Sequence, residues 1–344
     1  MDIQGSLRDI PMIRSFINKL LPALAVLAGC NTVGEAPMPP PDRVVVNFIG
    51  EVTRGTLDGT VESLDLLAFR THDGTLDAVG RSDGGSGISV SLSCGTALTF
   101  YILANCPEGS LEGISCLQDF LESETLLEEA AGDTPQMYDC STTEGLNALD
   151  NGSSILFHLK RYVAKVSLGS ISVPWLDEFE PQPECLIGRI ALVNAKGSSG
   201  RNGDSPHNGD LWYNRSGLDA PAGVSALLIR NAGTEVHGSA PVTCSTTLYA
   251  MPNHSDSEES YGSVAWTPRR SRLAIELIVD GVPQWYPVTL PHLDGNCHYT
   301  IQNVSITGPG ASHPDEEIVR NSIDFTISLT PWTETQEMIY FNNN

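Results

Sequence analysis

The chain is built from short apolar runs that alternate with polar residues and stop at turn-forming residues. In one run Ile88, Val90 and Leu92 recur with a period of two, which is typical of a β-strand with one buried face. Other candidate strands lie at residues 44–52, 61–69, 98–104 and 155–166, and later at 186–194, 246–251, 273–280, 284–290, 297–307 and 322–329. Such strands, separated by Gly, Pro, Asn and Asp turns, predict an all-β fold of stacked sheets.

One stretch departs from the strand period. Between residues 110 and 131 leucine and isoleucine recur at spacings near three and four, at Leu111, Ile114, Leu117, Leu121 and Leu127. This spacing places the apolar side chains on one face of a helix. We therefore expect one or two short amphipathic helices that cross over the first sandwich.

The length of 344 residues suggests about two domains. We expect the boundary near residues 167–176, where Pro174 and Trp175 interrupt the strand pattern. The N-terminal β-sandwich is predicted over residues 44–168 and the C-terminal β-sandwich over residues 169–344.

The chain is strongly acidic, with 42 Asp and Glu residues against 19 Lys and Arg residues and a formal charge of −23. Such a field repels phosphate backbones, so no nucleic-acid partner is expected. A soluble extracellular surface explains this charge better than a cation-binding surface does. Lys160, Arg161 and Lys165 gather in the candidate strand at 155–166. We expect these three side chains to face solvent, and a row that faces a partner is the alternative.

The N-terminal segment has the pattern of an export signal. Basic residues precede an apolar stretch at residues 20–26, which is too short to span a bilayer. The sequence Leu27-Ala28-Gly29-Cys30 resembles a bacterial lipobox. Residues 1–29 are therefore predicted to be a lipoprotein signal peptide, with Cys30 as the lipid-modified mature N-terminus; a buried helix with a chance cysteine is the alternative. The proline-rich residues 30–43 are predicted to form an extended tether.

Besides Cys30, the predicted mature chain contains seven cysteines: Cys94, Cys106, Cys116, Cys140, Cys185, Cys244 and Cys297. An exported protein permits disulfides, so one or two bridges among the four cysteines of the first half are one interpretation. Small buried thiols are the other interpretation.

No catalytic or cofactor motif is present in the sequence. His292, Asp294 and His298 lie close together but straddle a glycine turn, so we do not favour a metal site there. The polar loop at residues 201–210 has oxygen ligands for calcium but lacks the EF-hand spacing, and an ordinary loop is the simpler interpretation. Nucleophile-elbow and phosphate-loop patterns are also missing. We therefore expect no enzyme activity, no catalytic residues, no metal and no cofactor.

Several segments carry a family resemblance when they are taken in order. They are the lipobox at 27–30, the strand at 44–52 with Thr53-Arg54-Gly55 after it, the run at 61–69, Tyr101-Ile102-Leu103-Ala104-Asn105-Cys106-Pro107, and then residues 160–166, 299–310 and Pro331-Trp332. Each motif is loose, but the ordered set spans nearly the whole chain. It resembles the fimbrillin family, the type V pilus proteins of Gram-negative anaerobes.

The resemblance implies two transthyretin-like β-sandwich domains, with the helical crossover in the first, and export as a lipoprotein to the outer membrane. In such pilins an arginine-specific protease removes the first strand, and a strand from a neighbouring subunit fills the groove. The matching processing site here is Arg54, with Gly55 as the new N-terminus and residues 44–54 removed. Thr333–Phe341 is the candidate donor strand, or else the last strand of its own domain.

The expected function is that of a non-enzymatic cell-surface pilus subunit, with a tip or accessory adhesin favoured over a stalk or anchor subunit. The expected partners are other pilus subunits through strand exchange, the outer membrane through the lipid on Cys30, and a host or bacterial surface ligand. The main alternative is a monomeric surface lipoprotein that binds glycan or protein ligands without polymerising. A carbohydrate-active enzyme is a weaker alternative, because it needs a cleft with two suitably spaced carboxylates.

Overall fold

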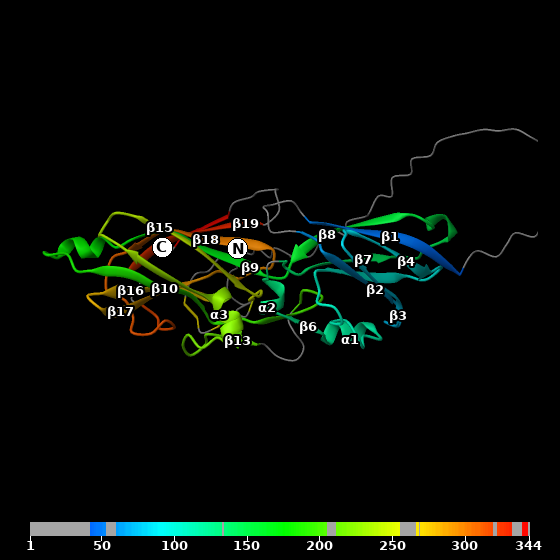
Figure 1. The fold of residues 1–344 in the computed structure, drawn as a ribbon, viewed down its shortest axis with the longest axis horizontal. Helices are drawn as coiled ribbons and strands as arrows, with labels where there is room; N and C mark the ends of the chain where they lie inside the picture. Colours follow the sequence, from blue (N-terminus) through cyan, green and yellow to red (C-terminus); the bar gives the residue numbers. More distant parts are fainter. Residues whose placement is uncertain are drawn as a thin grey trace, which may run out of the picture. The chain divides into compact units, whose positions relative to one another are not determined.

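The N-terminal half of the chain folds into a seven-stranded sheet (Figure 1). The structure is a computed structural model, and it describes residues 42–52, 60–132, 134–204, 211–254, 266–267, 269–318, 322–331 and 339–342. The strands of this sheet follow the order β3-β2-β5-β7-β8-β1-β4. Their bounds are β1 Arg43–Val52, β2 Ser63–Arg70, β3 Leu76–Asp83, β4 Gly87–Ser93, β5 Leu98–Ala104, β7 Met137–Thr143 and β8 Ser154–Arg161.

The two ends of this sheet meet across a shared core, so that the sheet forms a sandwich. Gly80 of β3 lies so close to β4 that an added Cβ atom would be 2.8 Å from Cγ2 of Val90 and 3.0 Å from Cδ1 of Ile88. Ile88, Val90 and Leu92 are all buried and belong to the same core as Phe100 of β5. The strand predicted from their period of two is therefore confirmed.

Most strands of this half were predicted correctly. β1, β2, β4 and β5 coincide with predicted runs, and β2 is buried along almost its whole length, as expected. β3 and β7 were missed because their apolar side chains do not alternate. β3 is partly or fully exposed at every position, and the second half of β7 is polar and mostly exposed.

A crossover with two short helices follows β5, and its first helix packs on β2 and β5. The crossover consists of α1 Leu117–Glu122, β6 Glu124–Leu126 and α2 Leu127–Ala130. The Phe120 ring of α1 lies 4.5 Å from the Tyr101 ring and 5.9 Å from the Phe69 ring, measured between centroids. The predicted crossover at residues 110–131 is thus confirmed in part. Its first residues form turns instead of a helix, and Gly113 there has a φ of +86°, which a right-handed helix does not allow.

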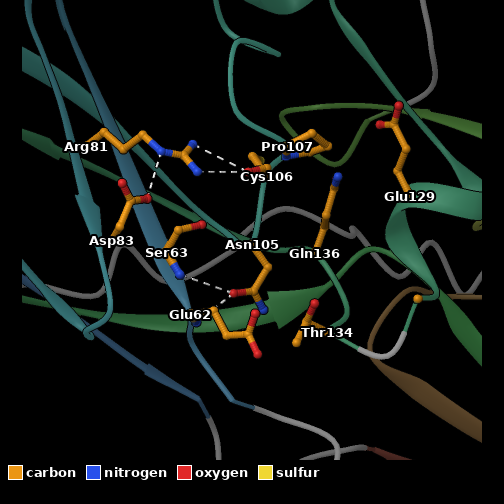
Figure 2. A pocket seen from close by; sticks show the side chains of 11 residues that line it. Glu62, Ser63, Arg81, Asp83, Asn105, Cys106, Pro107, Glu129, Thr134 and Gln136 are labelled. Atoms are coloured by element: carbon orange, nitrogen blue, oxygen red, sulfur yellow. Dashed lines mark hydrogen bonds and ion pairs between the residues drawn. The ribbon is translucent and has the colours of Figure 1, made fainter.

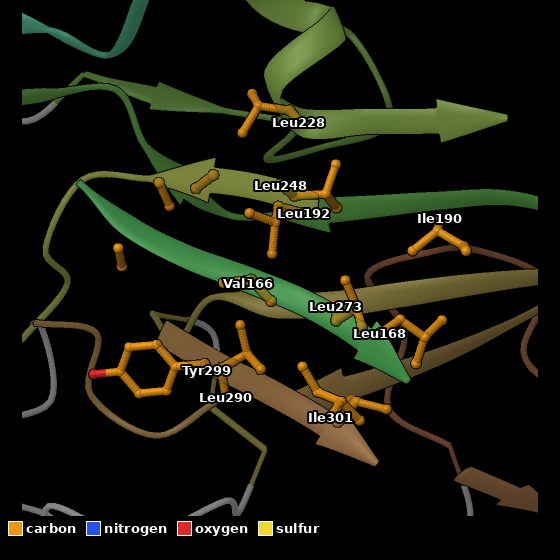
Figure 3. Packing of buried hydrophobic residues seen from close by; sticks show 14 of the residues in the cluster. Val166, Leu168, Ile190, Leu192, Leu228, Leu248, Leu273, Leu290, Tyr299 and Ile301 are labelled. Carbon is orange, nitrogen blue, oxygen red and sulfur yellow. The ribbon is translucent and has the colours of Figure 1, made fainter. Parts of the chain in front are cut away.

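The C-terminal half folds into two larger sheets, with the orders β14-β10-β16-β17 and β15-β9-β18-β19-β20. The bounds are β9 Ala164–Ser172, β10 Cys185–Val193, β14 Ile229–Glu235, β15 Val242–Ala250, β16 Arg272–Val279, β17 Val282–Thr289, β18 Cys297–Ile306, β19 Ile323–Pro331 and β20 Ile339–Asn342. Smaller elements of this half are η2 Pro174–Glu178, β11 Ala195–Lys196, β12 Ser198–Gly200, β13 Trp212–Tyr213 and α3 Ala222–Leu228, and the N-terminal half also contains η1 Ala148–Asp150. Figure 3 shows the core that the two sheets share, with Val166, Leu168, Leu192, Leu273 and Ile301 packed together. The strands predicted in this half are confirmed, and β14 was missed.

Both halves repeat one pairing scheme. In the first half β1 lies between antiparallel β4 and parallel β8, and in the second half β9 lies between antiparallel β15 and parallel β18. The order β3-β2-β5-β7 likewise corresponds to β14-β10-β16-β17. The second half adds β19 and β20 beyond β18. The chain therefore contains the same sandwich plan twice, without a sequence repeat of fixed period.

The prediction of one long strand over residues 155–166 is wrong. β8 ends at Arg161 and β9 begins at Ala164, and the two strands belong to different sheets. Arg161 is only 1% exposed, so the expected solvent-facing row applies to Lys160 but not to Arg161. The reason is that the chain passes here from one sandwich into the other, where the backbone N–H of Arg161 donates to Oδ1 of Asn296.

A second connection joins the two halves beside the link from β8 to β9. β6 of the crossover pairs with β12 in antiparallel register, residues 124–126 opposite 198–200. The Tyr162 hydroxyl donates to the carbonyl oxygen of Arg201 at 2.5 Å, and the Tyr162 ring stacks on Tyr138. The two halves therefore share main-chain pairing as well as side-chain contacts.

The division into domains at 44–168 and 169–344 stays a prediction. Residues 40–344 form one compact unit. By strand pairing, the change from the N-terminal to the C-terminal sheets falls at residues 162–163, because β9 pairs along its length with β15 and β18.

Candidate functional site

The first strand of the described chain is paired along both edges. β1 is antiparallel to β4 over residues 43–49 and parallel to β8 over residues 47–52. A strand in this position is held by main-chain hydrogen bonds to two neighbours that are distant in sequence. We call the space between β4 and β8 that β1 fills the β1 groove.

Alternate side chains of β1 point into the N-terminal core. Val44 is 1% exposed, and Val46 and Phe48 are fully buried. The Phe48 ring lies 5.2 Å from the Phe100 ring and 6.1 Å from the Phe157 ring, measured between centroids. The β1 groove is therefore an apolar trough with positions for every second side chain of the strand that occupies it.

The two faces of β1 differ in what they accept. At Gly50, on the buried face, an added Cβ atom would lie 2.9 Å from Cδ1 of Leu159, so only a residue without a side chain fits without displacing Leu159. On the outer face Val45 is 44% exposed, Ile49 36% and Leu156 48%. Two of these three apolar side chains belong to β1, so most of this exposed apolar surface would leave the molecule together with β1.

Solved structures of a fimbrilin and of a putative cell adhesion protein share this fold. A fimbrilin of Porphyromonas gingivalis matches 86% of this chain and 99% of its own, with a TM-score of 0.56 and 16% sequence identity. A putative cell adhesion protein of Bacteroides eggerthii matches 86% of this chain and 97% of its own, with a TM-score of 0.60 and 16% identity. The chain has the fimbrillin fold. No protein-family model and no curated protein sequence matches it.

The processing and lipidation sites expected from the fimbrillin resemblance lie outside the described residues. Cys30, Arg54 and Gly55 therefore stay predictions, as do the signal peptide and the tether. After β1 the described chain resumes at Thr60, whose carbonyl oxygen accepts a hydrogen bond from Nδ2 of Asn105. Among the described residues, no helix combines the length and the apolar character needed to span a bilayer.

The last described strand lies at the edge of the C-terminal sheet of this fimbrillin fold. β20 pairs antiparallel with β19, residues 339–342 opposite residues 326–329. The candidate donor Thr333–Phe341 is described only in its last residues. In this structure those residues serve as the final strand of their own sheet.

Of the three residues considered for a metal site, Asp294 and His292 both lie against His254, and His298 lies elsewhere. Oδ1 of Asp294 lies 2.7 Å from Nε2 of His254, and the His254 ring also lies beside that of His292. His298 instead faces β9, where its Nε2 lies 2.8 Å from Oγ of Ser167. Within the part of the chain that the structure describes, no three His, Cys, Asp or Glu side chains are grouped to hold a metal ion. Of the polar loop at 201–210, only residues 201–204 are described.

His298 is expected to make folding stability depend on pH. Burial, with a smaller effect from the charge of Lys165, lowers the pKa of His298 to about 4. An unfolded histidine binds its proton near pH 6.5. Between about pH 6.5 and 4 the unfolded chain therefore binds a proton that the folded chain does not. The free energy of unfolding is highest above about pH 6.5 with respect to this group, and it decreases as the pH falls from about 6.5 to 4. Urea unfolding across this range should show a flatter pH dependence for His298→Gln than for the wild type. Equal slopes for the two proteins would contradict this assignment.

The cysteines of the described chain are all free thiols, seven in number. Cys106, Cys185 and Cys244 are buried, and burial raises the pKa of the Cys106 thiol to about 12. These three residues follow the buried-thiol interpretation, and the alternative of local bridges in the first half is not realised in this structure.

A polar cavity of about 450 Å³ lies where β2 begins and β3 ends, beside the segments that follow β5 and α2 (Figure 2). The carboxylates of Glu62, Asp83 and Glu129 make its wall acidic, and the buried Gln136 also lines it. Sequence reasoning missed this cavity because its residues come from four separate segments and form no spaced motif. The only local signal was the turn at Asn105, which has a φ of +60° and ends β5 at the cavity.

Proposed function

We propose that this chain is a non-enzymatic fimbrial subunit or adhesin of the bacterial cell surface, exported as an outer-membrane lipoprotein through Cys30. The fold supports this proposal, since its structural neighbours include a fimbrilin and a putative cell adhesion protein. The observation that carries the proposal furthest is the placement of β1. One face of this strand is buried, both of its edges are paired, and it precedes the segment that contains the predicted processing site Arg54.

Assembly by strand exchange follows from that placement. Cleavage after Arg54 would leave β1 held only by noncovalent contacts, and its departure would open the β1 groove. The edges of β4 and β8 would then present unpaired N–H and C=O groups, and Phe100 and Phe157 would lose their Phe48 contact. A strand from another subunit would restore both, because main-chain pairing gives affinity and alternating side chains give register.

Thr333–Phe341 is the donor strand that we propose. Its described residues pair with β19 alone, at a sheet edge. In the β1 groove of a neighbouring subunit the same strand would gain two partners in place of one. This gain of a second paired edge would favour exchange over retention in its own sheet.

A tip or accessory adhesin is the role that we propose within a fimbrium. The partners are then other fimbrial subunits, the outer membrane and a surface ligand. A monomeric surface lipoprotein that binds glycan or protein ligands is the second candidate. It is favoured by the closed state of this structure, in which β1 fills its own groove and β20 pairs in its own sheet.

Processing at Arg54 is the test of this proposal. Protein recovered from the cell surface should begin at Gly55 in assembled material, whereas an Arg54→Lys variant should keep the longer chain and fail to assemble. Arg230→Lys, an equally conservative change at an exposed strand residue, is the matched control and should be processed normally. N-terminal sequencing and intact mass distinguish these forms. Assembled wild-type material that begins with lipid-modified Cys30 would reject removal of β1 and leave an anchor or a monomeric binder.

A further inference from the structure

The polar cavity contains a buried amide with an unused hydrogen-bonding position. Gln136 is 1% exposed, and its side-chain oxygen accepts a hydrogen bond from the Thr125 hydroxyl. Its Nε2 atom has no partner among the described residues. In Figure 2 the amide end of Gln136 extends among the side chains that line the cavity. A buried donor without an acceptor destabilises the folded state, so a ligand or a water that supplies the acceptor would stabilise this amide.

An unused acceptor lies in the same cavity. Oε2 of Glu129 is buried, and it accepts no hydrogen bond from any residue that the structure describes. Nη2 of Arg201 stands 4.0 Å from it, beyond hydrogen-bonding distance. One buried donor and one buried acceptor beside the cavity therefore have no hydrogen-bond partner among the described residues.

The cation of the wall, Arg81, is already engaged. Nη1 of Arg81 donates to both carboxylate oxygens of Asp65 at 3.1 and 2.9 Å, and its Nε donates to Asp83 at 3.0 Å. The positive charge of Arg81 is thus neutralised, and the carboxylates of Glu62 and Glu129 leave the cavity acidic. An anionic ligand would meet repulsion and, among the described residues of the lining, no free cation.

We propose that this cavity binds a neutral, hydroxyl-rich ligand, namely one sugar unit of a surface glycan. Gln136 Nε2 donates to one sugar oxygen, and Glu129 accepts from a sugar hydroxyl. A hydroxyl is both donor and acceptor, whereas a Lys or Arg side chain brings donors only and leaves the Gln136 amide unused. The volume of about 450 Å³ lies in the range of small-molecule sites. The inference rests on the proposed adhesin function and specifies its ligand class.

The test is a titration of the full chain with galactose, mannose, fucose and N-acetylglucosamine, observed by saturation-transfer NMR. At least one of these sugars should bind. Gln136→Met, which keeps the volume but removes the donor, should weaken binding by about tenfold or more. Glu129→Gln, which keeps the shape but replaces an acceptor oxygen, should do the same and serves if Gln136→Met fails to fold. Gln118→Met, at an exposed glutamine of α1, is the matched control and should bind as the wild type does.

Two results would overturn the inference. One is that none of the four sugars binds, or that binding is equally strong in the Gln136, Glu129 and Gln118 variants. The other is that N-acetyl-arginine amide binds and competes at the cavity while the sugars do not, which would indicate a peptide ligand. Both results are independent of the start at Gly55 in assembled material, so failure of the sugar site and failure of strand exchange are distinguishable.

Discussion

Phe48→Ala should lower the free energy of unfolding by about 3–5 kcal/mol, since it removes a fully buried aromatic ring from the N-terminal core. The ring contacts Phe100 and Phe157 on two other strands, so its loss leaves a cavity that β1 alone cannot close. Urea unfolding followed by far-UV circular dichroism measures the loss. Hydrogen exchange on peptides from β4 and β8 shows whether it is localised to the β1 groove.

Ile49→Ala is the matched control, because it lies next to Phe48 on the outer face of the same strand. Ile49 is 36% exposed, so its truncation should cost no more than about 1 kcal/mol. Equal losses for the two variants would mean that the alternation of β1 does not matter to the core. They would remove the main physical argument for a side-chain-specific groove.

A chain that begins at Gly55 should self-associate, because without β1 it exposes an apolar trough and two unpaired strand edges. Addition of a synthetic peptide with residues 43–52 should return it to a monomer, since the peptide restores the pairing to β4 and β8. Analytical ultracentrifugation measures both states. The material should change from mostly oligomeric to mostly monomeric once the peptide concentration exceeds the dissociation constant of the complex between the peptide and the shortened chain.

The control peptide carries serine in place of both Val46 and Phe48. It keeps the backbone that pairs with the groove but lacks the two fully buried side chains, so it should not dissociate the oligomers. A stable monomer that begins at Gly55 and ignores both peptides would contradict strand exchange through this groove.

The sequence predicted those strands that are mostly apolar and buried along almost their whole length, such as β2, and those in which burial alternates cleanly. β1 and β4 expose every second side chain, so their period of two marks both the strand and its buried face. β3 and β7 escaped detection because neither strand has a buried side chain at every second position. The break between β8 and β9 was missed although a signal exists. The buried residues have odd numbers at Phe157 and Leu159 but even numbers at Val166 and Leu168, so the phase shifts where the chain changes sheets.

Only those parts of the candidate site that lie within a single strand were predictable from the sequence. The side chains that β1 places in its groove follow from alternation along residues 44–50. The partners of β1 do not, because the pairing with β8 joins residues about a hundred positions apart in the chain. The polar cavity was unpredictable for the same reason. Gln136 gains its role from a fold that brings Thr125 and Glu129 beside it and leaves part of its amide facing the cavity.

The pairing of β6 with β12 has a mechanical consequence. Two sandwiches joined by the β8–β9 peptide alone would pivot about that point when tension is applied to the ends of a subunit. The added main-chain ladder at residues 124–126 and 198–200, with the stacked tyrosines beside it, opposes that bending. In the proposed fimbrial role, this junction would transmit a pulling force from one half to the other with little bending between them.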